Sequence, residues 1–174
     1  ADLVDADLII MGIRGHSAVS SFLFGSVSNA VLAHTHRPIL MLRDKLPEGT
    51  SLLRIGIACD GSEYGERAVD FVLKNRALFG SETRYELLNA GRSTHTIGLS
   101  SMASMMSSPT AAADMVKLRG QHFDAVMAAL MPKFEAEGIK PRPVRLDGNP
   151  GEVIADYAEN PPLDLLLMGS HGYG

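Results

Sequence analysis

Cysteine is almost absent from this sequence. Cys59 is the only cysteine among 174 residues, which excludes an intrachain disulfide framework and a cysteine-rich metal site. A single thiol is typical of proteins in a reducing compartment, so we expect a cytoplasmic location. Because Cys59 ends an apolar stretch, we interpret it as a small buried hydrophobic residue.

Clustered positive charge and long apolar runs are also missing. The formal net charge is −4 at pH 7, and without a run of Lys and Arg we expect neither a nucleic-acid partner nor a membrane surface as partner. No apolar stretch approaches the roughly 20 residues that a membrane-spanning helix needs. The chain opens with Ala1, with no initiator methionine and no signal peptide, and we interpret this start as the edge of a piece of a longer protein.

Short apolar runs alternate with amphipathic helical patterns along the chain. Its 174 residues suffice for one well-packed domain, or for one domain and a fragment. Strands are predicted at 8–11, 38–42, 54–59, 85–90, 144–146 and 163–168, and helices at 26–34, 62–80, 111–137 and 149–160. The alternation from residue 54 onward predicts an α/β fold with an open, doubly wound parallel sheet.

Local signals predict where these helices begin and end. Ser62 is the expected N-cap of the second helix and Gly80 its C-cap, while Asn149 and Pro150 start the last helix. Pro132 is expected to kink or divide the third helix. That helix carries an apolar stripe of Met115, Leu118, Phe123, Val126, Met127, Leu130 and Phe134. The segment 92–109 has no usable periodicity and is predicted to be a mobile surface loop, and prolines at 141 and 143 put strand 144–146 at a sheet edge.

A glycine-punctuated stretch, residues 7–31, is the strongest candidate for a binding site. Gly12 ends an apolar strand, Gly15 follows after two residues and Gly25 after nine more, and Ser26 then stands as the expected N-cap of a helix. Glycines allow the backbone to approach a ligand closely, and a helix N-terminus favours anions, so such a loop can cradle phosphates. The alternative is that these glycines only end a strand and shape a surface loop.

The spacing of these glycines, followed by Ser-Val-Ser at 26–28, resembles the nucleotide-binding loop of the universal stress protein family. The resemblance covers nearly all of the chain. It implies an adenine-nucleotide alpha-hydrolase-like fold with strand order 3-2-1-4-5, and ATP with Mg²⁺ as the bound cofactor. It also implies a regulatory or signalling role in the stress response, and a homodimer or an intrachain pseudo-dimer.

The resemblance also assigns roles to individual residues. Asp60, at the end of a strand, would contact the ribose, and the backbone of Ala90 would face the adenine. Gly12 would lie by the ribose, and the phosphates would lie by Gly15, Gly25, Ser26 and Val27, while Gly169 and Gly172 begin a second glycine loop. The alternative for Asp60 is that it bonds only the N–H groups of its own turn.

An internal repeat complicates this assignment. Residues 7–15 match residues 164–172 in Asp, Leu, Met and both glycines. We therefore expect a tandem protein in which 1–43 are the C-terminal part of a first domain, 44–52 a linker, and 53–174 a second domain without its last helix and strand. Asp60 and the complete first loop then belong to different repeats. Since local closure costs less entropy, we expect 163–168, rather than 8–11, to pair beside 54–59.

Residues for efficient catalysis are not recognisable in the sequence. It offers no nucleophile–base pair, no carboxylate dyad and no lysine beside the glycines of the kind found in P-loops. The primary prediction is therefore an ATP-binding regulatory protein with slow or no turnover, at most a weak ATPase. One alternative is a stress-family dimerisation or partner-binding module that binds no nucleotide. A second is a relative of adenine-nucleotide hydrolases or ligases.

Overall fold

The structure is a computed structural model that describes residues 6–12, 26–42, 52–91 and 109–169. The chain divides into two compact units, residues 1–49 with 171–174 and residues 50–170. The predicted mobile loop at 92–109 falls outside the described residues, except that Pro109 begins a helix. Among the helices that are described, none is long and apolar enough to cross a membrane.

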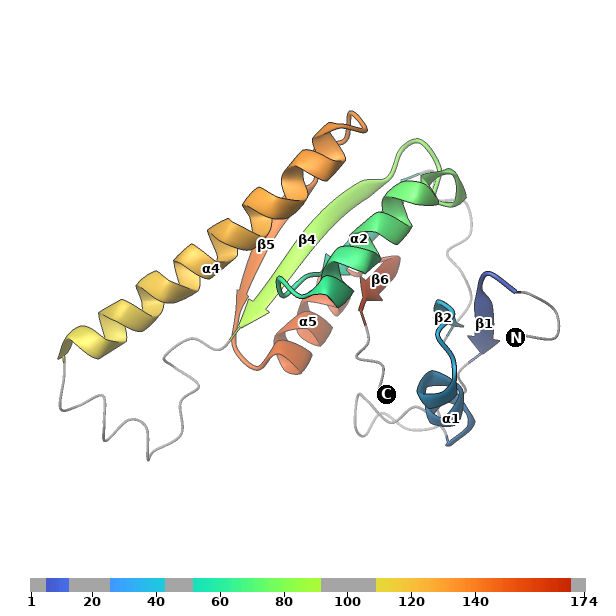
Figure 1. Ribbon diagram of the computed structural model, residues 1–174, viewed down its shortest axis with the longest axis horizontal. Coiled ribbons are helices and arrows are strands. Elements are labelled where there is room, and N and C mark those ends of the chain that lie inside the picture. The colour runs from blue at the N-terminus through green and yellow to red at the C-terminus, as the bar shows by residue number, and fades with distance from the viewer. Residues whose placement is uncertain (1–5, 13–25, 43–51, 92–108, 170–174) are drawn as a thin grey trace. The chain divides into compact units, whose positions relative to one another are not determined.

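The first unit contains one strand–helix–strand element. Strand β1 (Ile9–Gly12) is followed by helix α1 (Ser26–His34) and strand β2 (Ile39–Leu42), and the two strands pair in parallel (Figure 1). Helix α1 begins at Ser26 itself, so the prediction that Ser26 is the cap before the helix is wrong by one position. Serine fits the first turn of a helix as well as the cap, and the sequence pattern does not separate the two.

The second unit is built on a four-stranded parallel sheet. Its strands are β3 (Arg54–Ala58), β4 (Arg84–Gly91), β5 (Arg142–Asp147) and β6 (Leu165–Met168), in the order β5-β4-β3-β6. Strand β6 lies beside β3, with Leu167 opposite Ile57, as expected for residues 163–168. Strand β5 lies at an edge of this sheet, the position predicted from Pro141 and Pro143. The place of a fifth strand stays a prediction.

The helices of this unit cover the sheet on both faces. Helices α2 (Glu63–Lys74) and α4 (Pro109–Glu135) lie on the near face in Figure 1, and α5 (Pro150–Glu159) lies on the other. This arrangement follows from right-handed connections, because the chain moves one way across the sheet from β3 to β5 and then returns to β6. The core between the sheet, α2 and α4 includes Ile55, Ile57, Leu87, Val69, Val72, Val126, Leu130 and Phe134.

The capping predictions for α2 are right at its start and wrong at its end. Ser62 is the N-cap, and its Oγ accepts a hydrogen bond from the N–H of Gly65 at 3.3 Å. The helix ends at Lys74 rather than near Gly80, and a 3₁₀ turn, Arg76–Leu78, separates the two. The carbonyl of Phe71 accepts hydrogen bonds from both the backbone N–H and the side chain of Asn75, at 3.0 and 2.8 Å, so Asn75 caps the last turn of the helix.

Helix α4 differs from its prediction in two respects. It is not divided at Pro132, which lies three residues before the last helical residue. Phe134 is fully buried beyond the proline and Leu130 is buried before it, so packing on both sides holds the turn that lacks one hydrogen bond. The apolar stripe is buried only in its second half, because Met115 and Leu118 are exposed to solvent.

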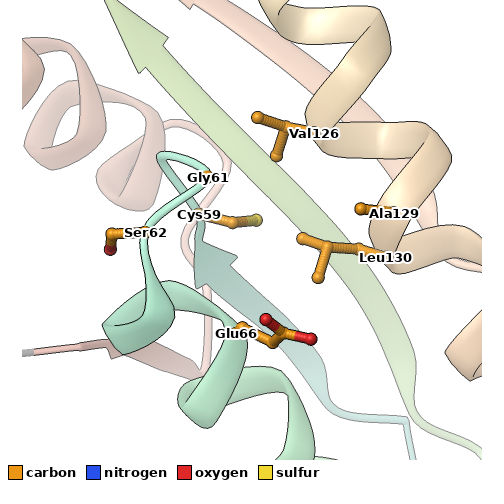
Figure 2. Close-up of a pocket in the computed structure, with 7 residues that line it drawn as sticks. All are labelled: Cys59, Gly61, Ser62, Glu66, Val126, Ala129 and Leu130. Atoms are coloured by element: carbon orange, nitrogen blue, oxygen red, sulfur yellow. The ribbon is translucent and has the colours of Figure 1, made fainter.

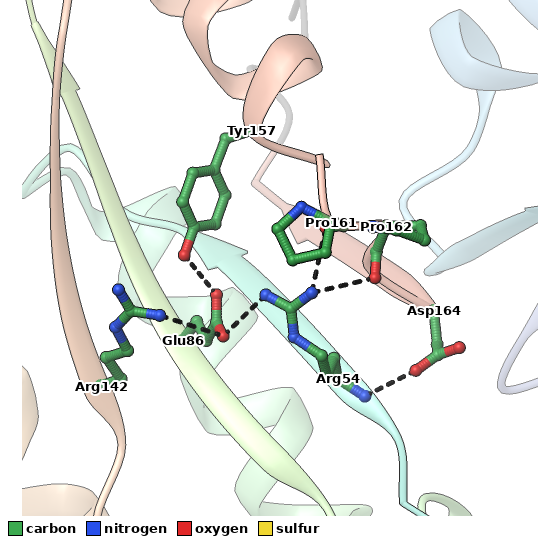
Figure 3. Close-up of polar contacts among 7 residues, drawn as sticks. All are labelled: Arg54, Glu86, Arg142, Tyr157, Pro161, Pro162 and Asp164. Atoms are coloured by element: carbon green, nitrogen blue, oxygen red, sulfur yellow. Dashed lines mark hydrogen bonds and ion pairs between the residues drawn. The ribbon is translucent and has the colours of Figure 1, made fainter. Parts of the chain in front are cut away.

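The amino-terminal ends of the strands are joined by a polar network, drawn in Figure 3. Glu86 of β4 is buried and accepts hydrogen bonds from Arg54 of β3 at 3.0 Å and from Tyr157 of α5 at 2.6 Å. The guanidinium of Arg54 also donates to the carbonyl of Pro161, and its backbone N–H donates to Asp164. This network holds β3, β4 and α5 together at the end of the sheet opposite to Asp60 and Gly169.

Candidate functional site

The carboxyl ends of β3 and β6 form the point where the chain reverses its direction across the sheet. From β3 the chain proceeds to β4 and β5 on one side, and it then returns to place β6 on the other side. Ligands of open α/β sheets bind outside the carboxyl ends of strands at such a point. Asp60 lies two residues beyond β3 and Gly169 follows β6 directly, so two of the predicted site residues lie here.

Asp60 organises the turn that leads from β3 into α2. Its Oδ1 accepts hydrogen bonds from the backbone N–H of Ser62 at 2.9 Å and from the hydroxyl of Ser62 at 2.5 Å. Gly61 between them has φ +88°, a left-handed conformation that favours glycine. Asp60 therefore accepts hydrogen bonds within its own turn, as the alternative interpretation predicts. The side chain of Asp60 is nevertheless exposed to solvent.

The first turn of α2 lies against the backbone at both strand ends. A Cβ added to Gly65 would lie 3.2 Å from Asp60 Oδ1 and 3.2 Å from Cys59 Cα. A Cβ added to Gly169 would lie only 2.3 Å from the carbonyl oxygen of Tyr64. Both glycines thus permit a close approach of backbone to backbone. The same helical turn contacts the end of β3 and the end of β6, which places Asp60 and Gly169 at one corner of the unit.

The other predicted site residues belong to other elements or fall outside the described residues. Gly12 ends β1 in the first unit, and Ser26 and Val27 begin α1, where the Val27 side chain is 68% exposed. Ala90 is in β4, opposite Leu146 of β5. Gly15, Gly25 and Gly172 fall outside the residues that the structure describes. Of the two glycine loops, it is therefore the second, through Gly169, that is described next to Asp60.

A polar cluster at the ends of β3, β4 and β5 was not predicted. Asn89 of β4 is fully buried, and its side-chain Nδ2 donates to the carbonyl of Cys59 at 2.7 Å. Arg119 of α4 donates to the side-chain oxygen of Asn89, and also to the carbonyls of Asn89 at 2.8 Å and Leu146 at 3.4 Å. The cluster links the residue before Asp60 to the residue before Ala90. In the sequence, Asn89 was the signal for this cluster, because it is a polar residue inside the apolar strand predicted at 85–90.

Cys59 is buried beside a small cavity under the Asp60 turn. It is 3% exposed, as predicted, and Figure 2 shows it with Gly61, Ser62, Glu66, Val126, Ala129 and Leu130 around this space. Burial, followed by the negative charge of Asp60, raises the pKa of the Cys59 thiol to about 12, so it is no nucleophile at neutral pH. The cavity has a volume of about 50 Å³, room for water but not for a nucleotide.

Nowhere in 6–12, 26–42, 52–91 and 109–169 do three or more His, Cys, Asp or Glu side chains gather so that they could hold a metal ion. In this part of the chain the candidate site offers the exposed carboxylate of Asp60, a glycine at a strand end, and the first turn of α2, which carries the exposed Glu63 and Glu66. Such a site can orient a polar ligand, and the imidazole of His122 lies beside the same turn, with Cε1 3.5 Å from the position of a Cβ on Gly61.

Comparison with known proteins identifies what the chain resembles. The family model described as the universal stress protein family matches residues 1–43 and 52–174. A Staphylococcus saprophyticus protein named as a universal stress protein is 48% identical over 46 residues, which are 26% of this chain and 28% of that protein. The chain thus spans less than a third of this curated relative.

Two solved structures show the same fold. A universal stress protein from Archaeoglobus fulgidus matches with a TM-score of 0.62 and 19% identity, over 95% of this chain and 51% of that one. A protein of the universal stress protein family from Burkholderia pseudomallei matches with a TM-score of 0.50 and 20% identity, over 71% of this chain and 85% of that one. These likenesses confirm the predicted α/β fold class with its parallel strands.

Proposed function

Because the chain belongs to the universal stress protein family, we propose that its second unit binds an adenine nucleotide at the carboxyl ends of β3, β4 and β6. The observation that carries this proposal is the position of Asp60 and Gly169 against the same first turn of α2. An exposed carboxylate next to a closely approached glycine provides an acceptor for ribose hydroxyls and a backbone that can come near phosphates.

Each part of the nucleotide has a proposed partner. The carboxylate of Asp60 accepts hydrogen bonds from the ribose, and the backbone of Ala90 at the end of β4 faces the adenine. The phosphates lie by the loop that Gly169 and Gly172 begin. ATP is the proposed nucleotide, with Mg²⁺ bound through the phosphates, because such ions are held by few protein groups when phosphates supply ligands.

The proposed biological role is regulatory. Bound ATP reports on the state of the cell during stress, and it is turned over slowly or not at all because the sequence offers no nucleophile–base pair. The protein acts in the cytoplasm, as a homodimer or an intrachain pseudo-dimer. In the first unit, the equivalent contacts belong to a preceding repeat: Gly12 by the ribose, and Gly15, Gly25, Ser26 and Val27 by the phosphates.

The domain organisation that supports this role is also proposed. Residues 1–43 are the C-terminal part of one universal stress domain, 44–52 a linker, and 53–174 a second domain. The family model matches in two segments, 1–43 and 52–174, which favours a tandem arrangement. One boundary between the two compact units falls at residues 49 and 50, within the proposed linker, whereas residues 171–174 group with the first unit.

One observation favours a second candidate function. Asp60 already accepts two hydrogen bonds from Ser62, which is enough to explain an aspartate at this turn without any ligand. In that case the chain is a dimerisation or partner-binding module of the stress family, and its glycines serve only the close packing of β6 on α2.

Equilibrium dialysis against ATP, with and without Mg²⁺, separates the two candidates. We expect ATP to be retained, more weakly without Mg²⁺, and we expect AMP to be retained with little dependence on Mg²⁺. Asp60→Ala should reduce retention, whereas Asp156→Ala, which removes an exposed carboxylate from α5, should leave it unchanged. Retention of neither nucleotide by the folded protein would favour the partner-binding module.

A further inference from the structure

Arg119 of α4 lies where three strand ends meet, and it has no role in the site described so far. We propose that Arg119 is a positioning residue: through Asn89 it fixes the backbone on either side of the adenosine, at Asp60 and at Ala90. The inference rests on the proposed nucleotide site and adds to it the residue that holds its base and ribose contacts in place.

The contacts of one guanidinium reach all three strands. Arg119 binds β4 at the side chain and carbonyl of Asn89, and it binds β5 at the carbonyl of Leu146. Asn89 extends the connection to β3 by donating to the carbonyl of Cys59. Cys59 directly precedes Asp60, and Asn89 directly precedes Ala90. A displacement of this guanidinium therefore moves the backbone at both proposed ligand contacts.

The strand end is shaped around the guanidinium. A Cβ added to Gly91 would lie 2.6 Å from Nε and 3.0 Å from Cζ of Arg119, so only glycine lets the arginine lie over the strand. Gly91 also accepts, at its carbonyl, a hydrogen bond from the N–H of Gly148 at 2.9 Å. Ala90 thus lies between two residues that contact Arg119: Asn89, which is hydrogen-bonded to it, and Gly91, which packs against it.

Stability alone is a poor reason to bury this cation. The Arg119 side chain is 11% exposed, its nearest carboxylate contact is Nε to Asp147 Oδ1 at 3.7 Å, and Nε is buried without a hydrogen bond. Burying a charge with incomplete pairing is expensive, and well-packed apolar residues often replace such groups without loss of stability. The guanidinium is planar and bonds several carbonyls at fixed angles, so it instead holds these carbonyls in a defined arrangement.

The matched control lies on the same helix. Lys133 is a second cation of α4, and it bridges to the side chains of Glu66 and Asp70 of α2 at 2.6 and 2.7 Å, rather than to the backbone of a strand. Arg119→Met and Lys133→Met therefore each remove one α4 cation and its contacts. Only the first removes contacts to the backbone next to Asp60 and Ala90. Amide NMR spectra of both nucleotide-free variants report whether residues 59–62 and 89–91 move.

The decisive readout is affinity for AMP and for inorganic phosphate, measured by calorimetry on the full chain. We expect Arg119→Met to shift the amide resonances at 59–62 and 89–91 and to weaken AMP binding at least about 10-fold, as loss of charge-assisted hydrogen bonds does. Any binding of phosphate, which lies by Gly169, should be unchanged. Lys133→Met should change neither affinity. Arg119→Lys keeps the charge but not the fork, so its AMP affinity should be intermediate.

Separate outcomes identify separate failures. If the wild-type chain binds AMP and Arg119→Met binds it equally well, the positioning role is overturned while the nucleotide site stands. If the wild-type chain binds no AMP, the proposed function fails and the positioning role fails with it. Should Arg119→Met not fold, Arg119→Lys decides: AMP affinity equal to that of the wild type overturns the positioning role.

Discussion

Tyr157 of α5 donates a hydrogen bond from its hydroxyl to Oε2 of Glu86 in β4 at 2.6 Å (Figure 3). Burial by itself would raise the pKa of Glu86, but the hydrogen bonds from Tyr157 and Arg54 and the charges of Arg54 and Arg142 outweigh it. The net effect holds the pKa of Glu86 below its ordinary value. The carboxylate is therefore ionised in the folded protein at neutral pH, and its ionisation stabilises the fold.

This lowered pKa predicts acid sensitivity. A carboxyl group whose pKa is lower in the folded than in the unfolded state contributes stability that is present above the unfolded-state pKa and is lost as pH falls through the folded-state value. We expect the melting temperature to fall as pH is lowered from about 5 to about 3, since an unperturbed glutamate titrates near 4.3. Thermal unfolding followed by circular dichroism at a series of pH values measures this loss.

The control for acid sensitivity is Glu86→Gln, which cannot ionise. It should be less stable than the wild type at pH 7, and the difference between the two should shrink as pH falls, because only the wild type loses a stabilising charge. A difference in melting temperature that stays constant from pH 7 to pH 3 would show that Glu86 does not titrate as described.

A pair of glycine substitutions tests the close packing of β6 on α2. Gly169→Ala would put a Cβ 2.3 Å from the carbonyl oxygen of Tyr64, and we expect it to lower the free energy of unfolding by about 1–3 kcal/mol. Gly120→Ala, in α4, places its Cβ in open space and should raise that free energy by about 0.5–1 kcal/mol. Urea denaturation of both variants measures the two effects, and equal effects would contradict the close approach at Gly169.

The two halves of α4 should respond differently to truncation. Phe134 is fully buried, and Phe134→Ala is expected to lower the free energy of unfolding by about 3–5 kcal/mol. Leu118 is 62% exposed, and Leu118→Ala should change it by less than about 0.5 kcal/mol. The same denaturation experiment compares them. A large loss from Leu118→Ala would mean that the first half of α4 is packed in solution.

Features that depend on a few neighbouring residues could be predicted from the sequence. Ser62 caps α2, Asn149 with Pro150 starts α5, and Cys59 is buried, because a cap or a strand end is a local choice of backbone and side chain. The pairing of β6 with β3 followed from the short connection between β5 and β6. These local signals fixed most elements of the second unit.

Features that depend on distant partners could not be predicted in this way. Arg119 and Asn89 are 30 positions apart, and no spacing rule connects an arginine on a helix to an asparagine inside a strand. Leu118 continues the apolar stripe of α4 but is exposed to solvent, and periodicity does not reveal where burial ends. At Asn75, the backbone N–H and the side chain both donate to the carbonyl of Phe71, and the helix ends there although propensity alone would extend it.

Amide NMR titration of the isotope-labelled chain with AMP tests the central claim most directly, because it reports where a nucleotide binds. The account predicts saturable chemical-shift changes at Asp60, Ala90 and Gly169, at the carboxyl ends of β3, β4 and β6. Tyr157 and Glu86, at the opposite end of the sheet, should be unaffected. Saturable changes confined to other residues, or no change at millimolar AMP, would contradict it.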